Sequence, residues 1–522
     1  MNKIKLYDTT LRDGAQGEGI SYSVMDKLLI AEELDKLGID YIEGGWPGAN
    51  PKDMEFYLKM AKKPLKQSQL VAFGSTRRPG IKAQDDANLK GLLKSQAKVV
   101  TIFGKTWDLH IREVLKTTLE ENLEMIKDTI NFLVSKGIVV FYDAELFFDA
   151  YRANKEYSLK CLLAAQDAGA KAVVLCDTNG GSLFTQIQQV VSEVRPKIKV
   201  VLGIHCHNDS GLAVANTIIA VQSGADMAQG TINGYGERCG NADLISVIAN
   251  LKLKLGIGCI SNDKLKDLTH LSRFVSEISN MKQRNDQPYT GESAFAHKGG
   301  VHINAVEKNA LTYEHIEPGL VGNHRRMLVS ELGGKTGILI RANDLGLDLT
   351  KDDPQTKRIL KLLQDMENRG YHFEGAQASF ELVMKRALKK YDKFFELEGF
   401  KVVVEKRSDK KIVSEAIIKL TVKGVKEHTA AEGDGPVNAL DNALRKALKD
   451  FYPTLSKMHL SDFKVRVLNE KGGTAARVRV LIQSQDEQQS WNTIGVSENI
   501  IQASWQALVD SVEYKLLKDN LK

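Results

Sequence analysis

The first part of the chain alternates short apolar runs with amphipathic segments, up to about residue 260. The apolar runs that predict strands are Ile4–Tyr7, Tyr41–Gly44, Leu70–Gly74, Val99–Phe103, Val139–Asp143, Ala172–Cys176, Val200–His205 and Asp226–Thr231. Between them lie segments with apolar residues at helical spacing, such as Val24–Leu37, Leu115–Lys136, Ser158–Asp167 and Gly211–Ser223. Repeated strand-then-helix units imply parallel strands joined by right-handed crossovers. Eight such units in this length predict an α/β fold, a closed (β/α)₈ barrel rather than an open sheet.

Polar side chains follow the predicted strands at their C-terminal ends. They are Arg12, Asp13, Glu43, Ser75, Thr76, Lys105, Glu145, Asp177, Thr178, His205, His207 and Asn233. For any single one of them a capped turn is the structural alternative, because Asp and Thr also cap helices. In barrel enzymes, however, this rim holds the active site. The placement therefore supports the barrel and indicates an enzyme.

A metal site is predicted where the seventh strand ends. His205 and His207 are two residues apart on a strand, so both imidazoles point to the same side, toward the barrel mouth. A lone histidine there would be a satisfied core residue, but two histidines opposite Asp13 form an N,N,O site with open positions. Such ligands suit Mn²⁺, Zn²⁺, Co²⁺ or Mg²⁺, and open positions suit Lewis-acid work on a carbonyl.

A Gly-rich segment, Asn233–Ala242, follows the eighth strand. Its glycines allow the backbone to turn over the barrel mouth, and Asn241 can offer a fourth oxygen ligand to the metal. A plain Gly-rich turn is the alternative. Cys239 has no adjacent base in the sequence, so we interpret it as inert rather than nucleophilic.

The alternation stops after about Ile260, and we predict three domains: the barrel (1–265), a mainly helical linker region (266–394) and an α+β domain (395–522). The last domain contains a near-repeat. Phe400–Val404 is echoed by Phe463–Val467, and Gly433–Leu444 is echoed by the stretch that ends at Leu508. Each copy is predicted to form three strands and a helix, and neither copy would bury its sheet alone.

Composition excludes several classes of protein. The 522 residues are 43% hydrophobic and 26% charged with a net charge of only +6, as in a globular protein that binds neither nucleic acid nor membrane. The five cysteines are odd in number and form no C-x-x-C pair, which favours a reducing cytoplasm. A strand is predicted almost at the first residue, so we expect no signal peptide.

Three motifs together resemble one known family. D-T-T-L-R-D-G, G-I-H-C-H-N-D and G-Y-G-E-R-C-G-N-A are similar to the acyl-CoA-condensing metallolyases with a D-R-E signature. This family includes isopropylmalate, homocitrate and citramalate synthases and hydroxymethylglutaryl-CoA lyase. The resemblance maps the signature onto Asp13, Arg12 and Glu145. It implies metal ligation by Asp13, His205, His207 and Asn241.

The resemblance extends beyond the barrel. F-A-H-K-G-G-V-H, which ends at His302, and Thr312-Tyr313-Glu314 are similar to the linker that the synthases extend into a partner subunit's active site. The resemblance therefore implies a homodimer with linker exchange. The family's roles carry over as catalysis by Arg12, Glu145, His302 and Tyr313 and substrate binding by Arg12, Thr178, His110 and Glu314.

The substrate prediction depends on the strand ends. The stretches at Tyr41–Gly48, Phe73–Arg78 and Phe103–Trp107 resemble the long bacterial citramalate synthases, which implies acetyl-CoA and pyruvate as substrates. A 2-isopropylmalate synthase stays open, because a missing methylene is worth only about 1–3 kcal/mol of selectivity. A lyase or a biotin-dependent carboxyltransferase with the same type of barrel would share the T-L-R-D-G and H-x-H motifs. An amino-acid-binding regulatory protein without catalysis would leave the polar rim unexplained.

A regulatory role is predicted for the C-terminal domain. E-G-D-G-P-V-N-A and K-G-G-T-A-A-R-V-R-V resemble the allosteric domain of these synthases. Turns that lead into helices can offer free backbone N–H groups to a carboxylate. We therefore predict effector contacts at Gly433, Asp434, Gly435, Pro436, Ser497 and Asn499. The resemblance implies isoleucine as the inhibitor, with leucine second, and a domain that only dimerises is the alternative.

Overall fold

The computed structural model describes residues 3–327, 354–388, 391–406, 412–468, 476–486 and 489–520. The chain divides into two compact units. The first comprises Met1–Phe295 and His315–Arg325, and the second comprises Ala296–Glu314 and Arg326–Lys522. The predicted boundary at residue 265 falls inside the first unit, and the three-domain division stays a prediction.

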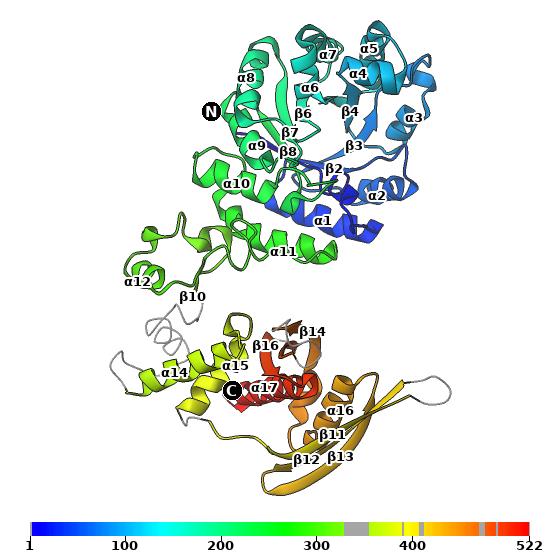
Figure 1. Cartoon of the computed structure of the whole chain (residues 1–522). Helices are drawn as coiled ribbons and strands as arrows, with labels where there is room; N and C mark the ends of the chain where they lie inside the picture. Colours follow the sequence, from blue (N-terminus) through cyan, green and yellow to red (C-terminus); the bar gives the residue numbers. More distant parts are fainter. Residues whose placement is uncertain are drawn as a thin grey trace. The chain divides into compact units, whose positions relative to one another are not determined.

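The first unit is built around a closed parallel barrel in the order β1 to β8, with β1 paired to β8 (Figure 1). Its strands are β1 (Lys5–Asp8), β2 (Tyr41–Gly45), β3 (Gln69–Ser75), β4 (Val99–Lys105), β5 (Val139–Glu145), β6 (Ala172–Asp177), β7 (Val201–Cys206) and β8 (Met227–Gly230). This confirms the predicted barrel. Tyr7, Tyr41, Phe141 and Met227 belong to the side-chain cluster that the strands enclose. A polar rim at the C-terminal strand ends is thereby held on a rigid frame.

Helices cover the outside of the barrel. They are α1 (Val24–Leu37), α2 (Pro51–Lys62), α3 (Ala87–Lys94), α4 (Asp108–His110), α5 (Leu119–Ser135), α6 (Phe147–Ala153), α7 (Lys155–Asp167), α8 (Phe184–Val194), α9 (Ala213–Gln222), α10 (Leu244–Leu253) and α11 (Leu268–Ile278). α1 has the predicted bounds, because Ser23 and Asp26 form a capping box and Gly38 ends the helix with φ 91°. α5 starts later than predicted, because Lys116 has φ 53° and Thr118 caps the helix.

The second unit begins with a short segment that contains β9 (Ala296–His297) and α12 (Gly300–Lys308). β9 pairs in parallel with β10 (Arg326–Met327). Two further helices follow, α14 (Pro354–Asn368) and α15 (Gln377–Ala387). None of the helices in the described ranges is long and apolar enough to span a membrane.

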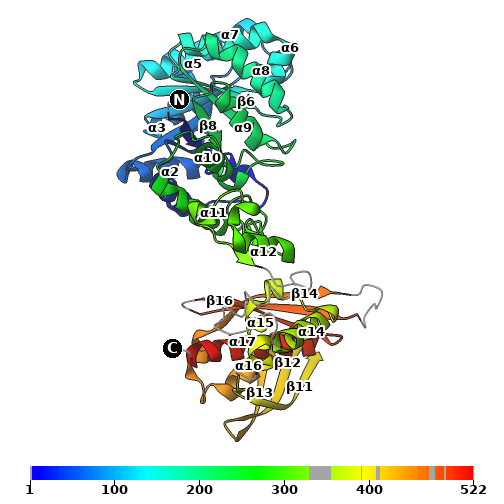
Figure 2. The ribbon, with the colours of Figure 1, turned by 90° about the vertical axis from the view of Figure 1, so that its left-hand side faces the viewer.

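The C-terminal part contains two copies of a three-stranded antiparallel sheet and a helix (Figure 2). The copies are β11 (Glu396–Lys406), β12 (Ile412–Val422), β13 (Val425–Gly433) with α16 (Pro436–Leu448), and β14 (His459–Val467), β15 (Val478–Gln485), β16 (Ser490–Ser497) with α17 (Ile500–Asn520). Their apolar faces share one core, which includes Ile418, Leu444, Ile482 and Trp505. The predicted duplication is confirmed. Residues 471–475 of the K-G-G-T-A motif lie outside the described residues.

Candidate metal and active site

His205 near the end of β7, His207 just after it and Asp13 in the loop after β1 meet at the barrel rim. His205 Nε2 lies 3.2 Å and His207 Nε2 lies 3.8 Å from Asp13 Oδ2. The two Nε2 atoms are 3.3 Å apart, and all three side chains are buried. Three potential ligand atoms thus converge within 4.8 Å of one another, as a divalent metal site requires.

Asn241 supplies a further observation in favour of a metal. Its backbone forms a β-bridge with His207, and its side-chain Nδ2 donates to the Tyr235 carbonyl. Its Oδ1 is buried and has no hydrogen-bond partner within the described part of the chain. A buried oxygen without a donor needs another partner. Two imidazoles, a carboxylate and an amide oxygen fit Mn²⁺, Co²⁺, Zn²⁺ or Mg²⁺.

The electrostatics of the three ligands also suit a cation. Burial opposes ionisation of Asp13, but the charge of Arg12 and the bond from His205 hold its pKa well below the usual range. Burial and the neighbouring His205 lower the pKa of His207 to about 4. Burial also disfavours the charged form of His205, but Asp13 raises its pKa above the ordinary value. A metal ion would compete with that proton, since it binds the neutral imidazole.

Arg12 is held by Glu43 and not by Glu145. Arg12 Nε donates to Glu43 Oε1 at 2.5 Å, and Arg12 Nη1 lies 3.4 Å from Asp13 Oδ1. Glu145 instead forms an ion pair with Lys105, with 2.5 Å between Oε2 and Nζ. Glu43 is a rim residue to which the sequence analysis assigned no role. The strand-end acid of β2 therefore pairs with Arg12, since β2 adjoins β1 in the barrel, and the assignment of the signature's Glu to Glu145 stays a prediction.

Two more groups that sequence reasoning missed lie beneath the ligands. Gln229 Oε1 is 3.0 Å from His205 Nδ1, and Gln229 Nε2 donates to Asp143 Oδ1 at 3.3 Å. Burial and the nearby Glu43 raise the pKa of Asp143 to about 7. Both residues lie inside predicted strands, where polar side chains among apolar neighbours were the available signal.

An aromatic wall, formed by Trp46, Phe73 and Phe103, stands beside Arg12. The Phe73 and Phe103 rings stack with centroids 5.3 Å apart, and Trp46 meets them edge-on at 5.8 and 5.6 Å. The Arg12 guanidinium lies 3.9 Å from the Phe73 ring centroid. Asn88 fixes Trp46 by accepting from its indole N–H at 2.5 Å. The rim therefore carries a rigid apolar surface next to the Arg12 guanidinium.

Thr178 and His110 occupy other parts of the rim. Thr178 follows β6, and its hydroxyl oxygen accepts from the Leu146 backbone N–H at 2.9 Å; a hydroxyl that accepts in this way can still donate its O–H. His110 lies in α4 and stacks on Trp107 with ring centroids 5.6 Å apart. Its buried Nδ1 has no partner among the described residues, and burial together with Lys105 lowers its pKa.

The predicted linker residues belong to the second unit, where the structure groups them with one another. His302 lies on α12, and its exposed ring stacks on Tyr313 at 4.0 Å between centroids. Glu314 is buried and lies 3.1 Å from His297 Nε2. The His302–Tyr313 stack is thus exposed to solvent, whereas the buried His297–Glu314 pair links the two ends of the segment 296–314.

The predicted regulatory turns are only partly as expected. Gly433 ends β13, Gly435 and Pro436 begin α16, and the Asp434 N–H donates to Asn438 Oδ1 at 3.1 Å. At the second turn, after Ser497, the N–H groups of Ile501 and Gln502 already donate to Asn499 Oδ1, at 2.8 and 3.2 Å. Asn499 therefore caps α17 itself.

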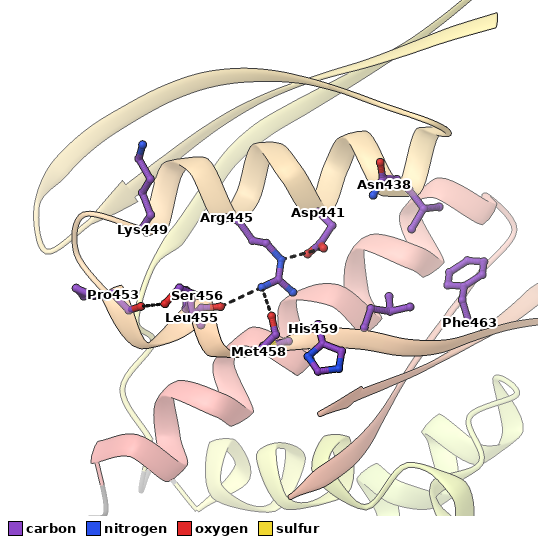
Figure 3. A pocket seen from close by; sticks show the side chains of 12 residues that line it. Asn438, Asp441, Arg445, Lys449, Pro453, Leu455, Ser456, Met458, His459 and Phe463 are labelled. Atoms are coloured by element: carbon purple, nitrogen blue, oxygen red, sulfur yellow. Dashed lines mark hydrogen bonds and ion pairs between the residues drawn. The ribbon is translucent and has the colours of Figure 1, made fainter. Parts of the chain in front are cut away.

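A cavity of about 670 Å³ lies beside the first of these turns, between α16 and β14 (Figure 3). Its apolar lining includes Val437, Met458 and Phe463. Arg445 crosses it, donating to Asp441 Oδ2 at 2.9 Å and to the Leu455 and Met458 carbonyls at 3.1 and 2.8 Å. The cations Arg445 and Lys449, the anion Asp441 and an apolar wall thus share a single cavity.

Comparison with known proteins covers the whole chain. The HMGL-like family model matches residues 3–275, the homocitrate synthase post-HMGL domain-like model matches 289–370, and the LeuA allosteric (dimerisation) domain model matches 374–516. An (R)-citramalate synthase of Geobacter sulfurreducens is 56% identical over 99% of this chain and 98% of its own length. The (R)-citramalate synthase of Aquifex aeolicus is 52% identical over the same shares. A 2-isopropylmalate synthase of Methanocaldococcus jannaschii is 31% identical over 99% of this chain and 95% of its own.

The full-length similarity and the barrel site agree with each other. The HMGL-like match spans all eight barrel strands and every candidate metal ligand, and the LeuA match spans both sheet-and-helix copies. The chain belongs to the (R)-citramalate synthase family, with an HMGL-like catalytic barrel and a LeuA-type C-terminal domain.

Proposed function

We propose that this chain is an (R)-citramalate synthase, which condenses acetyl-CoA with pyruvate and hydrolyses the product to citramalate and CoA. One observation carries the proposal: the buried Asp13–His205–His207 cluster shares a rim with Arg12 and the aromatic wall. Five (R)-citramalate synthases are 46–56% identical to this chain, whereas two 2-isopropylmalate synthases and one putative (R)-citramalate synthase are 30–31% identical, which favours pyruvate as the acceptor. The five free cysteines support a cytoplasmic location.

The chain's own residues would supply charge and orientation. A divalent metal on Asp13, His205, His207 and Asn241 provides Lewis-acid polarisation of the ketone when it is bound. Arg12 adds a second cation for the negative charge that develops on the ketone oxygen. Because Arg12 is fixed in advance by Glu43, it needs no reorganisation during the reaction. The free O–H of Thr178 is available to the pyruvate carboxylate.

The carbon–carbon bond requires removal of a proton from the acetyl methyl group. Glu145 and His302 are the candidate bases; the Tyr313 ring stacks on His302, and Glu314 follows Tyr313 in the chain. The resulting enolate carbon attacks the pyruvate ketone carbon, and the ketone oxygen takes up a proton to become the hydroxyl group. Water then attacks the thioester carbonyl, and the CoA thiol leaves. This last step makes the condensation irreversible.

The aromatic wall supports a small acceptor. Its three rings pack on one another and on Arg12, so the side chain of a bound 2-oxo acid would meet a rigid surface. A methyl group needs less room there than the isopropyl group of 2-oxoisovalerate. Steric discrimination of this size is worth about 1–3 kcal/mol for each methylene.

A CoA-release assay tests the proposal. The enzyme is incubated with acetyl-CoA and glyoxylate, pyruvate, 2-oxobutyrate, 2-oxoisovalerate or 2-oxoglutarate, and free thiol is measured. We expect the highest kcat/KM with pyruvate and no release without an oxo acid. A tenfold preference for 2-oxoisovalerate, about 1.4 kcal/mol in transition-state binding, would identify a 2-isopropylmalate synthase instead.

We also propose that the segment of α12 completes the active site of a second copy in a homodimer. The exposed stack of His302 on Tyr313 and the match to a dimerisation domain support this assembly. His302→Ala and His205→Ala chains should each be inactive, and mixing them should restore activity in hybrid dimers that hold one intact site. Subunit exchange without any rescue would contradict the arrangement.

For regulation, we propose that isoleucine, or leucine with lower affinity, binds the cavity beside α16. The carboxylate would face Arg445, the ammonium group would face Asp441, and the branched side chain would meet the apolar lining.

Val437→Phe fills this cavity and should raise the inhibitory isoleucine concentration at least about tenfold, with unchanged uninhibited kcat. Val425→Phe adds the same ring on exposed β13 and should leave inhibition unchanged. Equal inhibition of both variants would refute this location, and no binding of either amino acid to the full chain by calorimetry would refute the regulation.

A further inference from the structure

Gln229 lies between a candidate metal ligand and a buried carboxylate. Its Oε1 is 3.0 Å from His205 Nδ1, and its Nε2 is 3.3 Å from Asp143 Oδ1. Both Gln229 and Asp143 are buried inside the barrel. The three side chains therefore form a continuous hydrogen-bonded line that leads from the barrel interior to the metal site.

With Asp143 as the carboxylate, the chemistry of this line allows one arrangement. Asp143 Oδ1 accepts, so the Gln229 NH₂ group must face it, and Gln229 Oε1 then faces His205 Nδ1. That oxygen can only accept, so the His205 proton lies on Nδ1. In the neutral ring the lone pair is then on Nε2, the atom that faces Asp13 and His207. A reversed amide would set two donors against each other at His205 and two acceptors against each other at Asp143.

His207 is held differently. Its Nδ1 is buried and has no partner among the residues that the structure describes. Its position is set by the backbone, through the N–H bond to the Asp177 carbonyl and the bridge to Asn241. Of the two histidines, His205 is therefore the one whose ring orientation is set by another side chain.

We propose that Gln229, oriented by Asp143, is a positioning residue that fixes the His205 tautomer with Nε2 open to the metal. This inference rests on the metal site of the proposed function, and it adds two residues beyond the ligand set. Outer partners of metal-bound histidines commonly change metal affinity by about 10–100-fold when they are removed. The same range is expected here, although the partner is an amide and not a carboxylate.

The test measures Mn²⁺ affinity of the full-length protein by competition with a chelator, so it does not depend on the substrate. Gln229→Met keeps the length of the side chain without its polar atoms, and should raise the Kd about 10–100-fold. Gln229→Glu offers an acceptor in either orientation and should keep the Kd within about threefold of wild type, with a proton shared toward Asp143. Asn122→Leu removes another fully buried amide, on α5, and should leave the Kd unchanged.

Asp143→Asn tests whether Asp143 acts by orienting the Gln229 amide and not merely by filling space beside it. An asparagine can face the Gln229 amide in either of its orientations, so part of the population carries the reversed amide and the Kd should rise about 2–10-fold. In the Gln229→Glu background the same change should have a smaller effect, because a carboxylate needs no orienting. The comparison stands even where Gln229→Met does not fold. Equal effects of Asp143→Asn in both backgrounds, or a wild-type Kd in folded Gln229→Met, would overturn the inference. Tight Mn²⁺ binding without pyruvate-dependent CoA release would instead refute the proposed function.

Discussion

Replacing Glu43 by glutamine tests whether this residue, rather than Glu145, holds Arg12. The Glu43 carboxylate accepts from Arg12 Nε and from the Tyr7 hydroxyl, each at 2.5 Å, and it is fully buried. A glutamine of the same shape can still accept from Arg12 and can donate to the Tyr7 oxygen. The Tyr7 hydroxyl can then turn to Thr101 Oγ1, 2.7 Å away. The substitution therefore removes the negative charge and leaves the hydrogen-bond pattern satisfied.

The magnitude follows from what Arg12 retains. A hydrogen bond to a charged group contributes about 1.5–3 kcal/mol, and Arg12 still has Asp13 at 3.4 Å. We expect Glu43→Gln to lower the free energy of unfolding by about 2 kcal/mol. A single positioned donor at a developing oxyanion is worth about 2.7–4 kcal/mol in the transition state. Because Arg12 is then held by a hydrogen bond to a neutral amide and no longer by an ion pair with Glu43, kcat should fall, by at most about 100- to 1000-fold.

The assays are CoA release at saturating pyruvate and denaturant unfolding followed by tryptophan fluorescence. Glu145→Gln is the matched control, because it removes the same charge from a pair with Lys105 whose side chains are 16% and 22% exposed. Its cost in unfolding free energy should stay below about 1 kcal/mol. The unfolding measurement discriminates even if Glu145 is the catalytic base. Wild-type stability and kcat in Glu43→Gln, with losses of both in Glu145→Gln, would refute the pairing.

Further outcomes follow from other parts of the structure. Chelator treatment should abolish CoA release, added Mn²⁺ should restore it, and His207→Ala should not be restored; full activity in chelator would remove the metal from the mechanism. Phe73→Leu should shift the kcat/KM ratio toward 2-oxobutyrate by about 10–200-fold, and an unchanged ratio would place the acceptor elsewhere. Arg386→Met should lower the unfolding free energy by about 3 kcal/mol, because it leaves Asp510 and Glu513 without their cation. An unchanged denaturation curve would show that these ion pairs do not contribute to stability. Burial opposes ionisation of Asp35, but three backbone N–H groups lower its pKa, so its stabilisation is present above about pH 4 and is lost at lower pH; Asp35→Asn should flatten this acid limb of a denaturation series.

Local patterns were sufficient to predict the architecture. Strand positions in the barrel agree within a few residues, because a buried parallel strand must be continuously apolar and each helix must present an apolar stripe. The bounds of α1 follow from Ser23 and Gly38, which act on their immediate neighbours. His205 and His207, at the end of β7 and just beyond it, were found for the same reason, since residues two apart on an extended chain share a side.

Tertiary structure alone decided which side chains meet across the barrel. Arg12 and Glu43 are 31 positions apart, and they meet because β1 and β2 pair side by side in the barrel. Gln229 and Asp143 come from strands on different parts of the barrel, and in the sequence each is only a polar residue in an apolar run. Sequence spacing determines on which face of a strand a side chain lies. The distance between side chains of different strands is set by the register and closure of the barrel, because these depend on the packing of the whole core.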